Sequence, residues 1–428
     1  MGSHQKPSVG FVGLGAMGFG MAANLVKQGY SVTGYDVFAK SMERFKSEAG
    51  GNTAGSPAES ATDMPFYVCM VASAPQAQSV LFDAPDCVVK ALPRNATLLL
   101  CSTVPSAYAQ SVAEQLKSIG RGDILFVDCP VSGGATRAAN GTLTIMAGGS
   151  EDALAKARFL LEEMSDPNSL YIVEGGVGQG SNMKMVHQVL AAIHILLASE
   201  TMGLAARWGL DAKTVRDKVV ESEAWTWMFE NRVPRMLEED YFPGVSALTI
   251  ILKDVSIITS TARLNNFPTP LSSTAEQMYL LGLSQGFGSQ DDAGMVRLYF
   301  PEAVSSVQSK SEADDEKMHL LVQLLLAVQH CATAEAISLA SHLGLDLKQF
   351  HRLTTNAAGG SVVFREGGGA WIDSEESKSD QALWLRRQVD DAVLRDVATA
   401  LQQARDASCP LPLGTQAFNL LLQARIVT

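Results

Sequence analysis

The sequence is poor in cysteine, and its cysteines lie far apart. Six occur among 428 residues, and no two form a Cys-x-x-Cys pair. This spacing gives no indication of a zinc knuckle or a compact disulfide framework, so no bound metal is expected. Reduced thiols fit best with a cytosol-like compartment, which predicts a cytoplasmic location. The cysteines are Cys69, Cys87, Cys101, Cys129, Cys331 and Cys409.

Basic residues are scarce relative to acidic ones. The chain has 33 lysines and arginines against 45 acidic residues, which gives a net charge of -12 and an isoelectric point near 5.1. Proteins that bind nucleic acids need clustered cations to neutralise phosphates. We therefore expect no nucleic-acid partner.

Uninterrupted apolar runs are missing as well. Polar residues such as His194, Glu200 and Gln323 interrupt the long helical stretches, and no run approaches the roughly 18 residues that a membrane span requires. The first residues of the chain lack the pattern of a signal peptide. We therefore expect a soluble protein with no membrane partner.

What the sequence does contain is a change of pattern near its middle. Short apolar runs alternate with helical patterns over residues 7–174, which predicts an α/β Rossmann domain with a doubly wound, mostly parallel sheet. The remainder has helical spacing and no convincing strand, which predicts two tandem all-α domains at 175–307 and 316–428. Polar segments at 308–317 and 366–381 predict a linker and a loop, respectively.

One helical segment occurs twice. Residues from Gln188 to Phe229 reappear 135 positions later, and the match resumes from Asp254 at an offset of 142. These pairs predict a duplicated helical unit, whose copies can share a fold and differ in chemistry. The pairs are Gln188/Gln323, Glu200/Glu335, Leu204/Leu339, Ala205/Ala340, Gly209/Gly344, Leu210/Leu345, Asp211/Asp346, Phe229/Phe364, Asp254/Asp396, Val255/Val397, Ala262/Ala404, Arg263/Arg405, Pro268/Pro410, Pro270/Pro412 and Leu271/Leu413.

A glycine motif follows the first predicted strand. It reads Gly13-Leu14-Gly15-Ala16-Met17-Gly18 and opens the first predicted helix. Glycines in this context permit a tight turn and a close approach of pyrophosphate to the helix N-terminus. Asp36, at the end of the second strand, can bind the adenosine ribose and would repel a 2′-phosphate, so NAD is favoured over NADP. The nearby Lys40 leaves NADP as the weaker alternative.

Two further segments carry polar groups suited to an acid substrate. Residues 128–142 combine glycines and hydroxyls around Ser132, which suits capture of a carboxylate, although an ordinary loop is the alternative. Lys184, His187 and Gln188 share one face of a predicted helix. A lysine against apolar walls can take a proton from a hydroxyl, whereas the structural alternative is a solvated lysine and a packed histidine.

Four segments together resemble the signatures of the β-hydroxyacid dehydrogenase family. That family includes 3-hydroxyisobutyrate dehydrogenases, 6-phosphogluconate dehydrogenases and threonate-type sugar-acid dehydrogenases. The segments are Gly13–Gly18, Asp128–Gly134, Gly178–Lys184 and the pair Lys253-Asp254. The resemblance runs from about Val9 to Tyr299, and the string Lys184–Gln188 is closest to the sugar-acid members.

The resemblance implies roles for these residues. Lys184 would be the general base, and Gln188 would replace the family's orienting asparagine, with His187 beside it at the substrate. The substrate carboxylate would be held by Ser132, Gly133 and Gly134. Lys253 would lie near both nicotinamide and substrate, and the crevice for the cofactor would be lined by Ser73 and Thr103.

The two helical copies have divided the family's features. The substrate-side loop Asn-Ala-Ala-Gly-x-Ser appears as Asn356–Ser361 in the second copy, whereas the first copy reads Glu221–Thr226 there. Conversely, Lys184 corresponds to His319 in the second copy. We hypothesise that the second copy is an internal partner in a monomer or homodimer, with Asn356 and Ser361 reaching the substrate. A stabilising cap is the alternative.

These observations predict an NAD-dependent dehydrogenase of a small hydroxy acid, such as a polyhydroxylated four-carbon-like sugar acid. One alternative is a reductase of an aldehyde acid or an imine. Another is a non-catalytic pseudoenzyme that binds a nucleotide. Glu221 and Glu223 favour the pseudoenzyme because they would repel an acid substrate, whereas the intact Lys184 opposes it.

Overall fold

The computed structural model describes residues 6–307 and 315–426. It contains two compact units, the first ending at Lys184 and the second beginning at Met185. The boundary falls inside one long helix, α9 (Gln179–Arg207).

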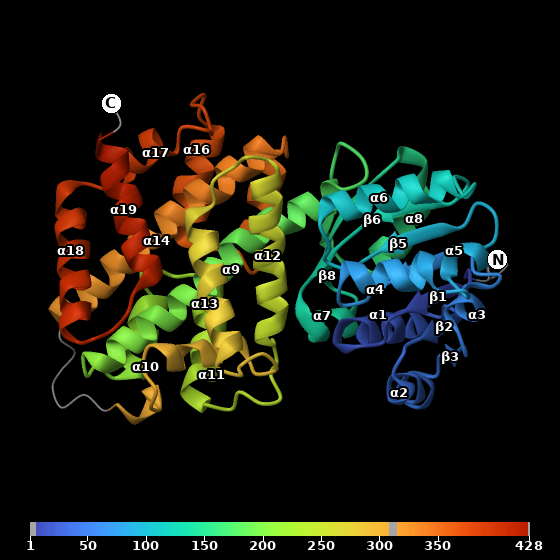
Figure 1. Cartoon of the computed structure of the whole chain (residues 1–428), viewed down its shortest axis with the longest axis horizontal. Helices are drawn as coiled ribbons and strands as arrows, with labels where there is room; N and C mark the ends of the chain where they lie inside the picture. The colour runs from blue at the N-terminus through green and yellow to red at the C-terminus, as the bar shows by residue number, and fades with distance from the viewer. Residues whose placement is uncertain (1–5, 308–314, 427–428) are drawn as a thin grey trace. The chain divides into compact units, whose positions relative to one another are not determined.

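The first unit is built on a nine-stranded sheet with the order β3-β2-β1-β4-β5-β6-β8-β7, and β9 pairs with β8 (Figure 1). Strands β1 to β6 pair in parallel, whereas β8 runs antiparallel to β6 and β7. The predicted doubly wound, mostly parallel sheet is therefore confirmed. The strands are β1 (Val9–Val12), β2 (Val32–Tyr35), β3 (Asn52–Thr53), β4 (Phe66–Cys69), β5 (Thr97–Leu100), β6 (Leu125–Asp128), β7 (Val131–Ser132), β8 (Leu143–Gly149) and β9 (Ser165–Ile172).

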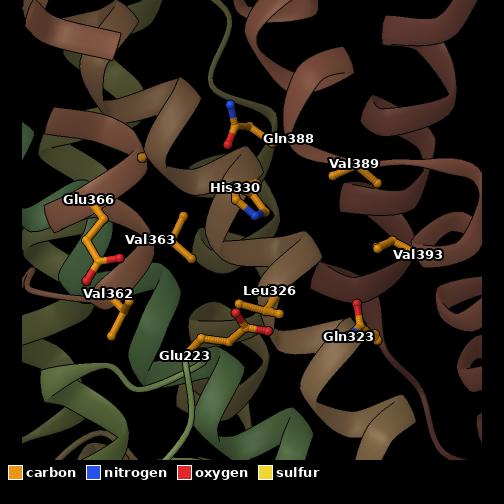
Figure 2. Close-up of a pocket in the computed structure, with 11 residues that line it drawn as sticks. Glu223, Gln323, Leu326, His330, Val362, Val363, Glu366, Gln388, Val389 and Val393 are labelled. Carbon is orange, nitrogen blue, oxygen red and sulfur yellow. The ribbon is translucent and has the colours of Figure 1, made fainter. Parts of the chain in front are cut away.

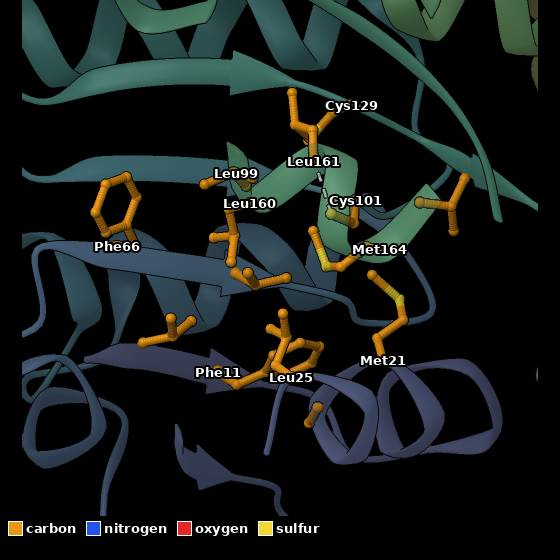
Figure 3. Close-up of a cluster of buried hydrophobic side chains, with 14 of the residues drawn as sticks. Phe11, Met21, Leu25, Phe66, Leu99, Cys101, Cys129, Leu160, Leu161 and Met164 are labelled. Carbon is orange, nitrogen blue, oxygen red and sulfur yellow. Dashed lines mark hydrogen bonds between the residues drawn. The ribbon is translucent and has the colours of Figure 1, made fainter. Parts of the chain in front are cut away.

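Alternate residues of the strands pack into two separate cores, because successive side chains of a strand point to opposite faces of the sheet. Phe11 packs with residues of α1 and α8 on one face, as Figure 3 shows, whereas Val12 packs with α5 and α6 on the other. Helices thus cover both faces of the sheet. They are α1 (Ala16–Lys27), α2 (Ala39–Ala49), α3 (Pro57–Ala61), α4 (Ala74–Gln78), η1 (Ser79–Asp83), α5 (Val88–Ala91), α6 (Ser106–Ser118), α7 (Gly134–Asn140) and α8 (Glu151–Met164).

The second unit consists of two helical copies, which confirms the predicted duplication. The first copy contains α9, α10 (Ala212–Val220), α11 (Trp227–Glu238), α12 (Leu248–Leu264), α13 (Pro270–Ser284), η2 (Asp292–Leu298) and η3 (Val304–Ser306). The second copy contains α14 (Asp315–His342), α15 (Leu347–Thr355), η4 (Phe364–Gly368), α16 (Gly369–Asp373), α17 (Gln381–Gln388), α18 (Asp391–Asp406) and α19 (Pro412–Ile426).

Paired residues produce the same local structure in both copies. Gly209 and Gly344 adopt φ values of +74° and +70° just after α9 and α14, a conformation that ends a helix and favours glycine. Asp211 and Asp346 then accept hydrogen bonds from backbone N–H groups in the first turns of α10 and α15. The matched helix boundaries thus follow directly from the repeated sequence.

The two copies contact each other reciprocally. Trp227 N donates to Gly360 O at 2.9 Å, and its counterpart Val362 N donates to Trp225 O at 3.3 Å. These bonds flank an antiparallel bridge between Thr226 and Ser361, which are themselves a pair at the offset of 135. An interface in which equivalent residues exchange the same bonds has approximate two-fold symmetry.

A second reciprocal contact joins buried glutamates to helix starts. Glu200 of α9 accepts hydrogen bonds from Leu413 N and Gly414 N of α19, at 2.8 and 3.2 Å. Its counterpart Glu335 of α14 accepts from Leu271 N and Ser272 N of α13, at 2.9 and 3.0 Å. Each copy therefore caps a helix of the other.

Several sequence expectations need correction. Helix α14 begins at Asp315, inside the segment predicted as a linker, whose residues 308–314 lie outside the described part of the chain. The predicted loop at 366–381 begins within η4 and contains α16, because Phe364, Trp371 and Ile372 are buried. Strand β9 was not predicted, since Asp-Pro-Asn-Ser at its start has no apolar pattern.

Helices α9 and α14 are also more apolar than expected. By length and composition each could cross a membrane, although the sequence predicted no run of that kind. The most apolar window is entirely buried within the protein in α9 and 78% buried in α14. Such burial is typical of core helices in a large domain.

Candidate active site

The glycine motif forms a tight turn between β1 and α1. Gly13 has φ +92°, and a Cβ placed on it would lie 2.1 Å from Met70 O. A Cβ on Gly18 would lie 1.9 Å from Gly13 O, so both positions require glycine. Gly15, at the N-cap of α1, faces open space and makes no side-chain cap. The Ala16 and Met17 amides open the helix, where a pyrophosphate could bind.

Asp36 holds a carboxylate beside this turn. Its Oδ2 accepts a hydrogen bond from Leu14 N at 2.7 Å, and its Oδ1 accepts from Phe38 N at 2.9 Å. Each carboxylate oxygen can accept a further bond, so ribose hydroxyl groups are suitable partners. The residues present therefore fit a dinucleotide with an unmodified ribose.

Ser73 and Thr103 follow the carboxyl ends of β4 and β5, where open α/β sheets bind ligands. Ser73 is the N-cap of α4, and its Oγ accepts from Gln76 N at 3.4 Å. Both residues therefore lie at the edge of the sheet at which the glycine turn also lies.

The predicted carboxylate site forms a turn between β7 and α7. Gly133 and Gly134 have φ values of +136° and +72°, a conformation that favours glycine, in the turn after Ser132. Backbone amides in such turns can bind an anion. Arg137 packs under Gly133, and its Nε donates to Thr142 O at 2.6 Å. Arg137 lies within residues 128–142, but its sequence pattern predicted no role for it.

Lys184 lies on the first turns of α9 and is only 5% exposed. The start of this helix is fixed to the sheet because Asp128, at the end of β6, accepts bonds from Ser181 N at 2.8 Å and Ser181 Oγ at 2.6 Å. Burial raises the pKa of Asp128 to about 6, and these bonds oppose the shift. A Cβ on Gly180 would lie 2.5 Å from Asp128 O, so glycine permits this close approach.

Three hydrogen bonds and one ion pair link the second copy to Lys253 within the helical unit. Gly359 N donates to His187 Nε2 at 3.2 Å, and His187 Nδ1 lies 3.0 Å from Gln188 Oε1. Gln188 Nε2 donates to Asp254 Oδ2 at 2.6 Å, and the other carboxylate oxygen forms an ion pair with Lys253 at 3.1 Å. We call these five residues the relay.

Asn356 and Ser361 flank Gly359 but make local contacts in the described structure. Asn356 is exposed, and its Nδ2 donates to Arg352 O at 3.1 Å. Ser361 is 1% exposed, and its Oγ accepts a hydrogen bond from Phe364 N, three residues later, at 3.0 Å. The predicted contact of these side chains with substrate therefore remains a prediction. The sequence pattern did not predict that Gly359 is the loop residue whose amide bonds to His187.

The corresponding loop of the first copy contacts the second copy instead. Ala224 O accepts from Gln329 Nε2 of α14 at 2.8 Å. Glu223 lines a cavity of about 370 Å³ with Gln323 and His330 of the same helix (Figure 2). Repulsion of an acid substrate by this loop was an argument for a pseudoenzyme. Glu223 faces this cavity, whereas Glu221 is not among the residues that line it.

All six cysteines are free and buried. Within residues 6–307 and 315–426, no group of three or more histidine, cysteine, aspartate or glutamate side chains could hold a metal ion.

Family models match both units. A model described as the NAD binding domain of 6-phosphogluconate dehydrogenase matches residues 8–176. A model described as NAD-binding of NADP-dependent 3-hydroxyisobutyrate dehydrogenase matches residues 178–299 and again 315–426. The second model therefore matches each helical copy separately.

Individual proteins are similar over about two thirds of the chain. The L-threonate dehydrogenase of Cupriavidus necator is 36% identical over 292 residues, which is 68% of this chain and 96% of that protein. A crystal structure of a 3-hydroxyisobutyrate dehydrogenase from Salmonella typhimurium is 35% identical, with a TM-score of 0.63 and coverage of 69% of this chain and 100% of that chain.

A 6-phosphogluconate dehydrogenase of Plasmodium falciparum is similar over almost the whole length. Its structure covers 98% of this chain and 93% of its own, with a TM-score of 0.72 and 14% identity. At this identity the likeness concerns the fold alone, including the duplicated helical copies.

Proposed function

This chain belongs to the NAD-dependent β-hydroxyacid dehydrogenases, and from that premise we propose that it oxidises a small polyhydroxylated acid, with Lys184 as general base. The observation that carries this proposal is the burial of Lys184 on a helix anchored to the nucleotide-binding sheet. Similarity to L-threonate dehydrogenase supports a four-carbon sugar acid as substrate.

Cofactor binding in this proposal depends on the glycine turn and Asp36. The N-terminus of α1 would hold the pyrophosphate, and Asp36 would bind the adenosine ribose. NAD is the preferred cofactor because the Asp36 carboxylate would repel a 2′-phosphate, and NADP remains the weaker alternative. When bound, the nicotinamide supplies the acceptor for a hydride.

Lys184 would take the proton of the substrate hydroxyl as the hydride leaves the same carbon. Lys184 is buried on α9, and in this proposal its amine acts in the neutral form, which can accept that proton. Ser132, Gly133 and Gly134 would bind the substrate carboxylate through a hydroxyl and backbone amides. Lys184 would return the proton if the reaction ran as a reduction.

The relay would hold His187, Gln188 and Lys253 at the substrate side of the helical unit. Gly359 comes from the second copy, so that copy would serve as an internal partner that completes the relay within one chain. The reciprocal contacts between copies support this arrangement. A monomer would then be sufficient for activity.

The test compares wild-type protein with Lys184→Met. We expect wild-type protein to form NADH from L-threonate or a stereoisomer, detected by its absorbance. Loss of a general base should lower kcat by about 10²–10⁴-fold. Binding of NADH, measured by fluorescence, should be retained.

Two results would contradict this proposal. One is a Lys184→Met variant with nearly wild-type kcat. The other is a panel of four- to six-carbon sugar acids that gives no NADH while the wild-type protein binds NADH tightly, which would support the non-catalytic alternative.

A further inference from the structure

One arginine lies against the turn to which the proposed function assigns the substrate carboxylate. Arg137 of α7 fills the space beside Gly133, since a Cβ placed on Gly133 would lie 2.9 Å from Arg137 Cδ and 3.3 Å from Arg137 Nε. The guanidinium carbon is bonded directly to Nε, so the charged group lies close to the backbone of this turn. Residues 133–136 are exposed, so a ligand could reach them.

The half-buried side chain of Arg137 is held in place. Its Nε donates a hydrogen bond to Thr142 O at 2.6 Å, and the backbone O of Arg137 accepts one from Thr142 N at 2.9 Å. These bonds keep the stem of the side chain along Gly133. A side chain that is already ordered loses little conformational entropy when it binds a ligand.

Within residues 6–307 and 315–426, Arg137 forms no ion pair with a carboxylate. Other arginines of the sheet unit do, namely Arg44, Arg121 and Arg158. A guanidinium group binds carboxylates well, because it can donate two parallel N–H bonds and always carries its charge. An anionic ligand would therefore provide the acidic partner that the described chain does not.

An acid substrate needs a positive charge at this turn. The chain has a net charge of -12, which disfavours the approach of an anion. The Ser132 hydroxyl and the backbone amides supply dipoles but no full charge. In the proposed mechanism Lys184 acts as a neutral amine, and Lys253 already pairs with Asp254 at 3.1 Å. Arg137 is the cation that lies against the turn itself.

We propose that Arg137 determines the specificity for acids over neutral ligands, an inference that rests on the proposed function. Its guanidinium group neutralises the substrate carboxylate held at Ser132, Gly133 and Gly134. Arg137 takes no part in the transfer of the proton or the hydride. It therefore stabilises the bound substrate and the transition state alike, which lowers KM and leaves kcat nearly unchanged.

Calorimetric titration of the protein saturated with NADH tests this proposal. The reduced cofactor prevents oxidation, so binding alone is measured. The ligands are L-threonate and its neutral amide, L-threonamide, which differ in the charge of one group. We expect the wild-type protein to bind L-threonate about ten-fold more tightly than L-threonamide, because a charge-assisted pair of bonds is stronger than a neutral one.

Arg137→Gln separates the charge from the structural bond. The Nε2 of glutamine is as many bonds from Cα as the Nε of arginine, so it can still donate to Thr142 O. We expect this variant to bind L-threonate about ten-fold more weakly and L-threonamide as wild type. Its KM for an oxidised sugar acid should rise by a similar factor. Arg158→Gln, which removes an exposed positive charge on α8, is the matched control and should bind both ligands as wild type.

The proposal is overturned if Arg137→Gln, shown to be folded by circular dichroism, binds L-threonate as tightly as wild type. It is also overturned if wild-type protein binds both ligands equally or binds neither. Formation of NADH and the Lys184→Met variant judge the proposed oxidation separately. An active enzyme whose KM is the same in Arg137→Gln would contradict this inference alone.

Discussion

At the scale of single residues, the relay assigns a donor or an acceptor role to each group along it. Gly359 N–H can only donate, so His187 Nε2 accepts and its Nδ1 carries the proton. That proton is donated to Gln188 Oε1, which leaves the Gln188 amide to donate to Asp254. The relay therefore holds His187 as one neutral tautomer.

Gly359→Ala should disturb the relay at its first bond. A Cβ there would lie 2.8 Å from Thr354 Cγ2 and 3.1 Å from His187 O, so the loop would have to move. Loss of one hydrogen bond, about 0.5–1.5 kcal/mol, should reduce kcat/KM by roughly two- to ten-fold. Steady-state kinetics on the preferred sugar acid provide the measurement.

Ala358→Ser is the control, because it changes the neighbouring side chain and leaves the Gly359 amide in place. Unchanged kcat/KM in Gly359→Ala, with a melting temperature like that of wild type, would mean that the relay does not contribute to catalysis.

At the scale of elements, two helices receive their caps from the opposite copy. Helices α13 and α19 begin at Pro270 and Pro412, and proline is well suited to a first helical position. The amides that follow each proline bond to a buried glutamate of α14 or α9. A carboxyl group at a helix start also interacts favourably with the helix dipole.

These glutamates predict a pH-dependent stability. Burial raises the pKa of Glu200 to about 8 and that of Glu335 to about 7, from 4.5, against the opposing effect of their hydrogen bonds. A carboxyl group with a raised pKa keeps its proton longer in the folded state, so its contribution to stability falls as pH rises from about 5 to about 8. The contribution lost should be of the order of a few kcal/mol.

Urea unfolding at several pH values measures this effect. A variant with Glu200→Gln and Glu335→Gln keeps the shape of both side chains but cannot titrate, so its midpoint should vary less with pH than that of wild type. Glu238→Gln, on the surface-facing end of α11, should behave as wild type. Equal slopes for the double variant and wild type would show that these glutamates do not control stability.

The elements also show what sequence can predict. Strands β1, β2, β4, β5, β6 and β8 coincide with the short apolar runs that alternate with helical patterns in the sequence. Strands β3 and β7 have two residues each, too few for a period, and β9 is polar at its exposed start. Helix α16 begins at the last of three consecutive glycines, which locally favour a loop, and is stabilised by burial of Trp371.

The candidate site likewise contains features that local sequence patterns predict and one contact that they do not. The glycine turn and Lys184 were predicted because their patterns are local in sequence. The bond between Gly359 and His187 spans 172 positions, and no local pattern specifies it. The loop Asn356–Ser361 was predicted from its sequence pattern. Its contact with His187 is made by the backbone amide of Gly359, whereas the side chains of Asn356 and Ser361 do not make it.

At the scale of the whole molecule, the second copy covers apolar surface of the first. The most apolar window is entirely buried in α9 and 78% buried in α14. A chain ending at residue 307 would lose the amides that bond to Glu200 and the loop that bonds to His187. We expect this truncated chain to associate with itself or precipitate, because apolar surface would be exposed.

Light scattering after size exclusion measures this outcome. The full chain, of 45.6 kDa, should elute as a monomer if the internal partner suffices. A truncated chain that remains a soluble, active monomer would contradict the role of the second copy as internal partner.

The reciprocal contacts between the loops at Thr226 and Ser361 also have an evolutionary consequence. In an assembly of two identical subunits, each mutation is expressed at both symmetry-related places, so one place cannot change alone. Here a peptide connection joins the two halves, and Trp225 and Gly360 differ although they occupy equivalent positions at the bridge. Selection could therefore act on each half independently, keeping Lys184 in one while substituting His319 in the other.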